Sequence, residues 1–159
     1  MIDTGLMATA PSKEALIAAV EAAVGETLAY FDGPGQRSTA MVGDWGAWDI
    51  LAHLWYFHYA TTWGIRSSMV GGPAWKLPGT ADEINAACLP LHRGESFDQL
   101  IAELRLAQER LLRAAREAAD LDAPAFERTD GTTVSIRERL ETIARHWNGH
   151  LRALQEAGG

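Results

Sequence analysis

The chain contains 159 residues, a length typical of one domain, and 47% of them are hydrophobic, which excludes a largely disordered protein. Its formal net charge of −7 argues against nucleic acid or an anionic membrane as a partner, because both bind to concentrated basic surfaces. The single cysteine, Cys88, excludes an internal disulfide, and we expect a cytoplasmic localisation.

The first ten residues contain neither a basic segment nor a long apolar run, so we expect a flexible N-terminus at 1–10 and no signal peptide. Helical periodicity then predicts a first helix over residues 12–31, with apolar residues recurring at spacings of three and four. Residues 32–35, DGPG, end this helix. We expect a glycine there to adopt the left-handed conformation of a helix cap, and proline cannot continue the helix.

A second helix is predicted over residues 46–70, and it stops where two glycines and a proline follow. The segment is apolar nearly all round, which is typical of a helix buried on several sides. Asp49, His53 and His58 interrupt it, so it is too polar for a membrane span. We expect Gly64 to leave room beside His53 on one face of this helix.

Three further helices are predicted over residues 80–89, 96–119 and 135–157. Each opens with a hydroxyl residue followed three positions later by Glu or Gln, the capping-box pattern: Thr80 with Glu83, Ser96 with Gln99, and Ser135 with Glu138. Residues 121–134 contain a turn at Asp130-Gly131 and no convincing strand pattern.

The whole chain, 1–159, is therefore predicted to be one all-α domain. We expect a four-helix bundle of up-and-down or crossover topology, with a short extra helix between helices two and three. Residues 75–76 are expected to lie in a surface loop, and a lid over a site is the alternative. Cys88 has apolar neighbours and no basic residue beside it, so it is a poor nucleophile candidate.

Two histidines on the last helix, His146 and His150, are four residues apart, so their imidazoles lie on one face about one turn apart. Two nitrogen donors at this spacing can chelate one metal ion. A third ligand must come from another helix, and His53 on the second helix is the candidate. His58 lies about 140° further round that helix and is not expected to join the site. His92 is a weaker candidate.

The same pattern also occurs in half-buried histidines that only form hydrogen bonds with their neighbours, and the spacing alone does not decide. A metal held by three neutral imidazoles would keep positions open for water or substrate, as catalytic zinc sites do. Asp49, one turn before His53, is a candidate to orient that imidazole or to act as a base. Alternatively, it is only an acid in the first helical turn, favourable to the helix dipole.

Two segments carry a family resemblance: residues 45–54, WGAWDILAHL, and residues 143–151, IARHWNGHL. They are similar to the two histidine signatures of the DinB-like superfamily, which includes the mycothiol-dependent maleylpyruvate isomerase N-terminal domains and bacillithiol transferase-like proteins. The resemblance implies a four-helix bundle, often a homodimer, that binds a divalent ion such as Zn²⁺ or Ni²⁺ through three histidines. The ligand positions carry over to His53, His146 and His150.

The resemblance also implies a reaction class, because several members of the superfamily are thiol S-transferases or isomerases. A divalent ion can lower the pKa of bound water or hold a thiol as the thiolate. We therefore expect a metal-dependent enzyme that transfers or adds a low-molecular-weight thiol cosubstrate to an electrophilic small molecule. The alternatives are a non-catalytic or metal-independent bundle that binds a small molecule or toxin, a hydrolase similar to the ClbS/DfsB-like sister group, and a dimerisation module.

Overall fold

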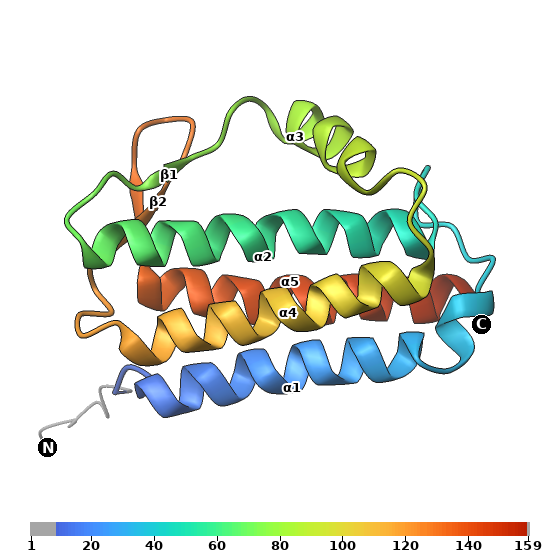
Figure 1. Ribbon diagram of the computed structural model, residues 1–159, viewed down its shortest axis with the longest axis horizontal. Coiled ribbons are helices and arrows are strands. Elements are labelled where there is room, and N and C mark those ends of the chain that lie inside the picture. The colour runs from blue at the N-terminus through green and yellow to red at the C-terminus, as the bar shows by residue number, and fades with distance from the viewer. Residues whose placement is uncertain (1–8, 159) are drawn as a thin grey trace, which may run out of the picture.

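The computed structural model describes residues 9–158, so most of the N-terminal segment expected to be flexible lies outside the described residues. Four long helices form the predicted bundle (Figure 1): α1 (Lys13–Phe31), α2 (Ala47–Met69), α4 (Phe97–Glu117) and α5 (Ile136–Gly158). The predicted extra helix is α3 (Ala81–Cys88), and short 3₁₀ turns cover Pro34–Arg37 and Leu89–His92. The expectation of a helical bundle is confirmed.

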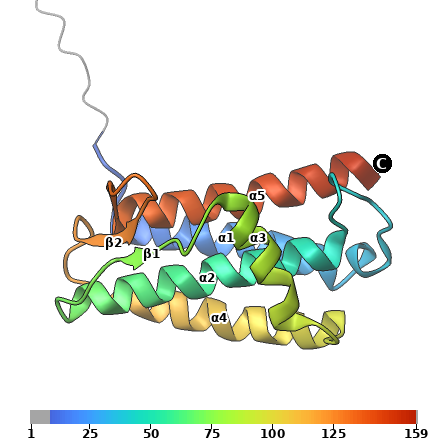
Figure 2. The same cartoon turned by 90° about the horizontal axis from the view of Figure 1, so that it is seen from above.

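The bundle has a crossover topology, because α2 and α4 run in the same direction while α1 and α5 run in the opposite one (Figure 1). At the starts of α2 and α4, the indole N–H of Trp48 donates to the backbone carbonyl of Glu95 at 3.1 Å. At their ends, Arg66 lies 3.8 Å from Glu117. The connection between α2 and α4 therefore returns along the bundle, and it places α3 beside the first half of α2 (Figures 1 and 2).

The three predicted capping boxes are all present, so local sequence determines where these helices begin. At the end of α2, Gly71 has a φ of 72° and the N–H of Gly72 donates to the carbonyl of Ser67 at 2.8 Å, which satisfies a terminal carbonyl. The left-handed cap expected after α1 is wrong, because Gly33 has a φ of −123°. Gly33 has a ψ of −121°, and Pro34, which follows it directly, disfavours the helical region for the residue before it.

A small sheet packs on one end of the bundle, and the expectation that residues 121–134 and 75–76 form no strands is wrong. Strand β2 (Pro124–Glu127) pairs in parallel with β1 (Trp75–Lys76) and antiparallel with β3 (Thr133–Ser135). The predicted turn at Asp130-Gly131 joins β2 to β3, and Gly131 has a φ of 84°. Strands of two to four residues are too short for an alternating pattern to identify them.

Gly64 of α2 allows the sheet to approach the helix closely. A Cβ atom at this position would lie 2.2 Å from the backbone carbonyl oxygen of Ala125 on β2. Beside this contact, Ala60, Phe126 and Val134 form a small apolar cluster of their own. The space that we expected Gly64 to leave free is therefore occupied by the backbone of β2. This glycine allows the sheet to pack against the helix.

The main core lies between the four long helices. The apolar stripes of the last two long helices are buried in it: Leu100, Leu104, Leu111 and Ala114 on α4, and Ile136, Leu140, Ile143, Trp147, Leu151 and Leu154 on α5. Within residues 9–158, no helix is both long and apolar enough to cross a membrane. The start of α1 and the end of α5 lie at opposite ends of the bundle (Figure 1).

Replacing Gly64 by alanine should lower the free energy of unfolding by about 1–3 kcal/mol, because the new methyl group would overlap the Ala125 carbonyl. The control is Gly25→Ala on the exposed side of α1, where a Cβ meets nothing within 4 Å. That change should raise the free energy of unfolding by up to about 1 kcal/mol. Urea denaturation followed by circular dichroism measures both. Equal effects would contradict the close contact.

Candidate metal centre

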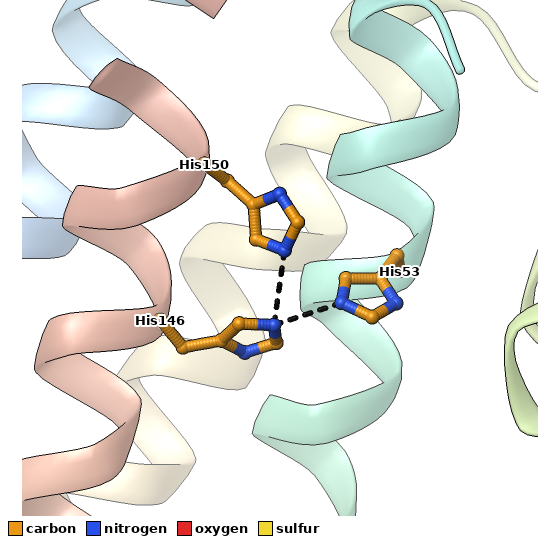
Figure 3. Close-up of side chains that lie close together, drawn as sticks. All are labelled: His53, His146 and His150. Carbon is orange, nitrogen blue, oxygen red and sulfur yellow. Dashed lines mark hydrogen bonds between the residues drawn. The ribbon is translucent and has the colours of Figure 1, made fainter. Parts of the chain in front are cut away.

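Three histidine rings meet between α2 and α5 (Figure 3). His53 comes from α2, and His146 and His150 come from successive turns of α5. The Nε2 atom of His146 lies 2.8 Å from Nε2 of His53 and 3.0 Å from Nε2 of His150. The structure therefore brings together the three histidines that the sequence singles out, with all three Nε2 atoms turned toward one another.

The rings are held in place by neighbours on both helices. His146 and His150 flank Trp147, which is fully buried in the core, so their side chains leave α5 at the edge of its apolar stripe. The rings of Trp45 and Phe57 each pack against His53 at 4.9 Å between centroids, and Phe57 also packs edge-on against His146 at 5.3 Å. Apolar walls thus shield the histidines from water on two sides.

Burial keeps these imidazoles neutral. Burial, together with a smaller contribution from repulsion between the rings, lowers the pKa of His53 to about 4 and the pKa of His146 to about 3. Burial also lowers the pKa of His150. All three rings are therefore unprotonated near pH 7, which is the state in which imidazole binds metal ions.

Hydrogen bonds among the three rings cannot satisfy all their nitrogens. Each ring nitrogen of a neutral imidazole carries either one proton or one lone pair. Nε2 of His146 faces two other nitrogens but can complete only one good hydrogen bond, and the buried Nδ1 of His53 has no partner at hydrogen-bond geometry. A single cation would accept all three lone pairs, so the donor set fits a divalent ion such as Zn²⁺ or Ni²⁺.

The distances between the nitrogens are also compatible with such an ion. An ion held at roughly 2.0–2.1 Å separates two nitrogen ligands by about 3.3 Å in tetrahedral geometry. The separations of 2.8 and 3.0 Å between these rings are a few tenths of an ångström shorter. Small side-chain rotations of His146 would therefore be enough to accommodate an ion.

Of the two roles considered for Asp49, the structure contains the one at the start of the helix and no hydrogen bond to the histidine cluster. Its carboxylate accepts the backbone N–H of Gly46 at 2.8 Å and caps the start of α2. No hydrogen bond joins it to His53, so it does not orient that imidazole. The alternative, an acid in the first helical turn, describes what the structure contains.

The other two described histidines lie outside the site. His58 is fully buried on another face of α2, where its Nε2 lies 2.6 Å from Oε1 of Gln108. His92 pairs with Glu95 at 2.9 Å and lies 3.7 Å from Glu103. Sequence reasoning missed this second His–Glu cluster, although the i,i+3 spacing of His92 and Glu95 before α4 was a usable signal.

A cleft of about 410 Å³ lies between α3 and the segment before α2. None of the three histidines lines it, but Trp45 does, and its ring packs on His53; Asn85 lines the cleft from α3. Asp44 and Asp82 also line the cleft, which makes its wall acidic. Sequence reasoning missed Asn85, because the position of α3 depends on tertiary packing.

Comparison with known proteins supports the fold. No family model matches the sequence, and no curated protein matches it. Two solved structures of mycothiol-dependent maleylpyruvate isomerase are similar, one of them a variant with a histidine replaced by alanine, with TM-scores of 0.74 (the variant) and 0.72. Their sequences are 15% and 17% identical to this chain over 91% of its length.

The chain spans 61% of the length of these two structures. At this sequence identity the likeness establishes a shared fold. The four-helix bundle that the resemblance of residues 45–54 and 143–151 implied is thus confirmed.

The lowered histidine pKa values predict that the metal-free protein loses stability in mild acid. The unfolded chain takes up protons below about pH 6.5, whereas folded His53 and His146 stay neutral down to pH values near 4. The free energy of unfolding should therefore fall as the pH drops, by up to about 2 kcal/mol for each of these two rings at pH 5.

Urea denaturation of metal-free protein at pH 7, 6 and 5 measures this effect. The variant His146→Gln removes the ring with the lowest pKa and should show a shallower decline. A free energy of unfolding that stays constant from pH 7 to pH 5 would show that the rings are not held neutral.

Proposed function

We propose that His53, His146 and His150 together bind one divalent metal ion, with Zn²⁺ or Ni²⁺ as the natural occupants. We further propose that the protein is a metal-dependent enzyme that transfers or adds a low-molecular-weight thiol to an electrophilic small molecule. One observation carries the proposal: three neutral imidazoles direct their Nε2 atoms toward one another, and the rings of His53 and His150 compete for the one good hydrogen bond that Nε2 of His146 can complete.

A divalent ion with three protein ligands keeps a coordination position open and lowers the pKa of a thiol or water that occupies it. The chain's own residues supply the surroundings. Trp45 and Phe57 exclude water from two sides of the histidines, which strengthens electrostatic interactions there. The amide of Asn85 lines the adjacent cleft, where it can form a hydrogen bond with a bound substrate.

The reactive thiol has to come from a cosubstrate. Cys88 is the only cysteine of the chain, it is fully buried, and burial raises its pKa to about 11. A thiol in this environment stays protonated at pH 7 and cannot act as a nucleophile. The fold neighbours support a thiol cosubstrate, because both are named as a mycothiol-dependent enzyme.

The acidic wall of the cleft indicates the charge of the electrophile. Asp44 and Asp82 line the cleft beside His53, and they would repel a second negative charge. We infer that the substrate is a neutral or cationic electrophile. A dicarboxylate would bind less well in this cleft.

One observation favours a second candidate function, a metal-bearing protein that binds small molecules without turnover. Asp49, the acid closest to His53 in the sequence of α2, caps the helix through one carboxylate oxygen and forms no hydrogen bond with His53, so it is not positioned against the three rings as a general base. Metal binding and catalysis are therefore tested separately below.

Purified protein without a histidine tag should contain about one divalent ion per chain, and His150→Ala should lose most of it while keeping its helicity. The control is His58→Asn. It replaces the imidazole beside Gln108 by an amide, on a face of α2 away from the site, and should retain the ion. Elemental analysis by mass spectrometry measures the metal, and circular dichroism measures helicity. Full retention of metal by His150→Ala would refute the ligand set.

Catalysis can be tested with 1-chloro-2,4-dinitrobenzene, a neutral electrophile, and with mycothiol, bacillithiol or glutathione as the thiol. Enzyme loaded with Zn²⁺ or Ni²⁺ should accelerate thioether formation, and both chelation and His146→Ala should abolish the acceleration. Bound metal without turnover for any thiol and electrophile would favour the binding protein. Turnover that survives His146→Ala would exclude the metal mechanism.

A further inference from the structure

A second hollow lies on the opposite side of α2 from the histidines. It is a groove of about 360 Å³ between α2 and α4, within the size range of small-molecule sites. Trp55 lines it and follows His53 by two residues, so its side chain leaves the helix about 200° away from the histidine face. The two hollows are therefore separate, and an occupant of this groove would not contact the three histidines.

Aromatic rings form the α2 wall of the groove. Trp55 and Tyr59 are stacked, with centroids 5.4 Å apart and planes 6° apart. Trp63 packs edge-on against Trp75 of β1 at 5.1 Å, and Tyr59 packs against the same ring at 6.0 Å. The sheet thus fixes these rings in place. Tyr59 and Trp63 remain 45% and 38% exposed, so a ligand can reach them.

Two arginines lie at one end of the groove. Arg66 comes from α2 and Arg110 from α4, and the parallel course of these helices brings both to the same end. Arg110 forms no ion pair with any residue from 9 to 158. Arg66 has only a long contact to Glu117 at 3.8 Å, and such an exposed pair stabilises little. Both guanidinium groups are therefore available to an anion. Glu103, the acid that also lines the groove, lies seven residues before Arg110 on α4, toward the other end of the groove, and 3.7 Å from His92.

We propose that this groove is a binding site for a planar aromatic anion. The ring of the ligand would lie against Tyr59 and Trp63, and its carboxylate or sulfonate would face Arg66 and Arg110. Aromatic side chains offer flat surfaces for stacking, and guanidinium groups pair with carboxylates through two parallel hydrogen bonds. The proposal is independent of the metal site and of the thiol reaction.

The test uses 8-anilinonaphthalene-1-sulfonate, a planar aromatic anion whose fluorescence rises in apolar sites, and N-phenyl-1-naphthylamine, its neutral counterpart. The anion should bind with one site per chain. The double variant Arg66→Gln/Arg110→Gln should weaken binding of the anion about ten-fold and leave the neutral dye within about two-fold. Trp63→Ala should weaken both dyes. Loading the protein with Zn²⁺ should change neither affinity.

Arg113→Gln is the matched control, because Arg113 is an exposed arginine of α4 on the side toward Glu21, outside the groove. This variant should bind both dyes as the unmodified protein does. The proposal would be overturned if the arginine double variant bound the anion as tightly as the unmodified protein does. It would also be overturned if Arg113→Gln lost as much affinity for the anion as the double variant. Sedimentation velocity tests a different occupant of the groove. If the unmodified protein is a dimer that binds neither dye, and Trp63→Ala is a monomer, the groove is an interface with a second copy and the proposal is wrong.

Discussion

Helix α2 buries side chains on several of its faces, and the other elements of the molecule pack around it to cover them. Eleven of its residues are buried, on faces that contact α4, α5, α3 and β2. The crossover after α2 contributes to this burial, because the segment that connects α2 to α4 brings β1 and α3 into contact with the helix. The same helix then carries His53 on one face, Gly64 against the sheet, and the aromatic wall of the groove on another. Its sequence is therefore constrained at nearly every position for a different reason.

Local chemistry explains why the helices and their starts could be predicted. The capping boxes at Ser96 and Ser135 involve residues three positions apart, and the apolar stripes repeat within each helix, so both are visible without knowing the fold. The sheet could not be predicted in this way. Strand β1 has two residues and pairs with a segment about 50 positions later, and no local pattern encodes that partner. The end of α1 was misjudged for a local reason, because Pro34 acts on the backbone of the glycine before it.

The candidate site shows the same division. The pair on α5 follows from a spacing of four residues, and His53 follows from the face of α2 and from a family resemblance. By contrast, the positions of Asn85 and of the acidic wall of the cleft depend on how α3 packs after the crossover. The role of Asp49 could not be decided from the sequence, because it depends on which group its carboxylate binds. The low pKa values of the three rings also depend on packing, because they arise from burial by Trp45, Phe57 and the surrounding helices. Spacing can indicate which ligands meet, whereas their protonation state requires the folded environment.

The start of α1 and the end of α5 lie at opposite ends of the bundle, which has a practical consequence for affinity purification. His150 lies eight residues before Gly158, so a polyhistidine extension fused after α5 would begin about 12 Å along the helix from the imidazole cluster. Such a tail could reach the cluster and offer competing imidazoles to any ion held there. An extension fused ahead of α1 would leave from the far end of the bundle. Metal stoichiometry is therefore best measured on protein carrying its tag at the N-terminus, or on protein from which the tag has been removed.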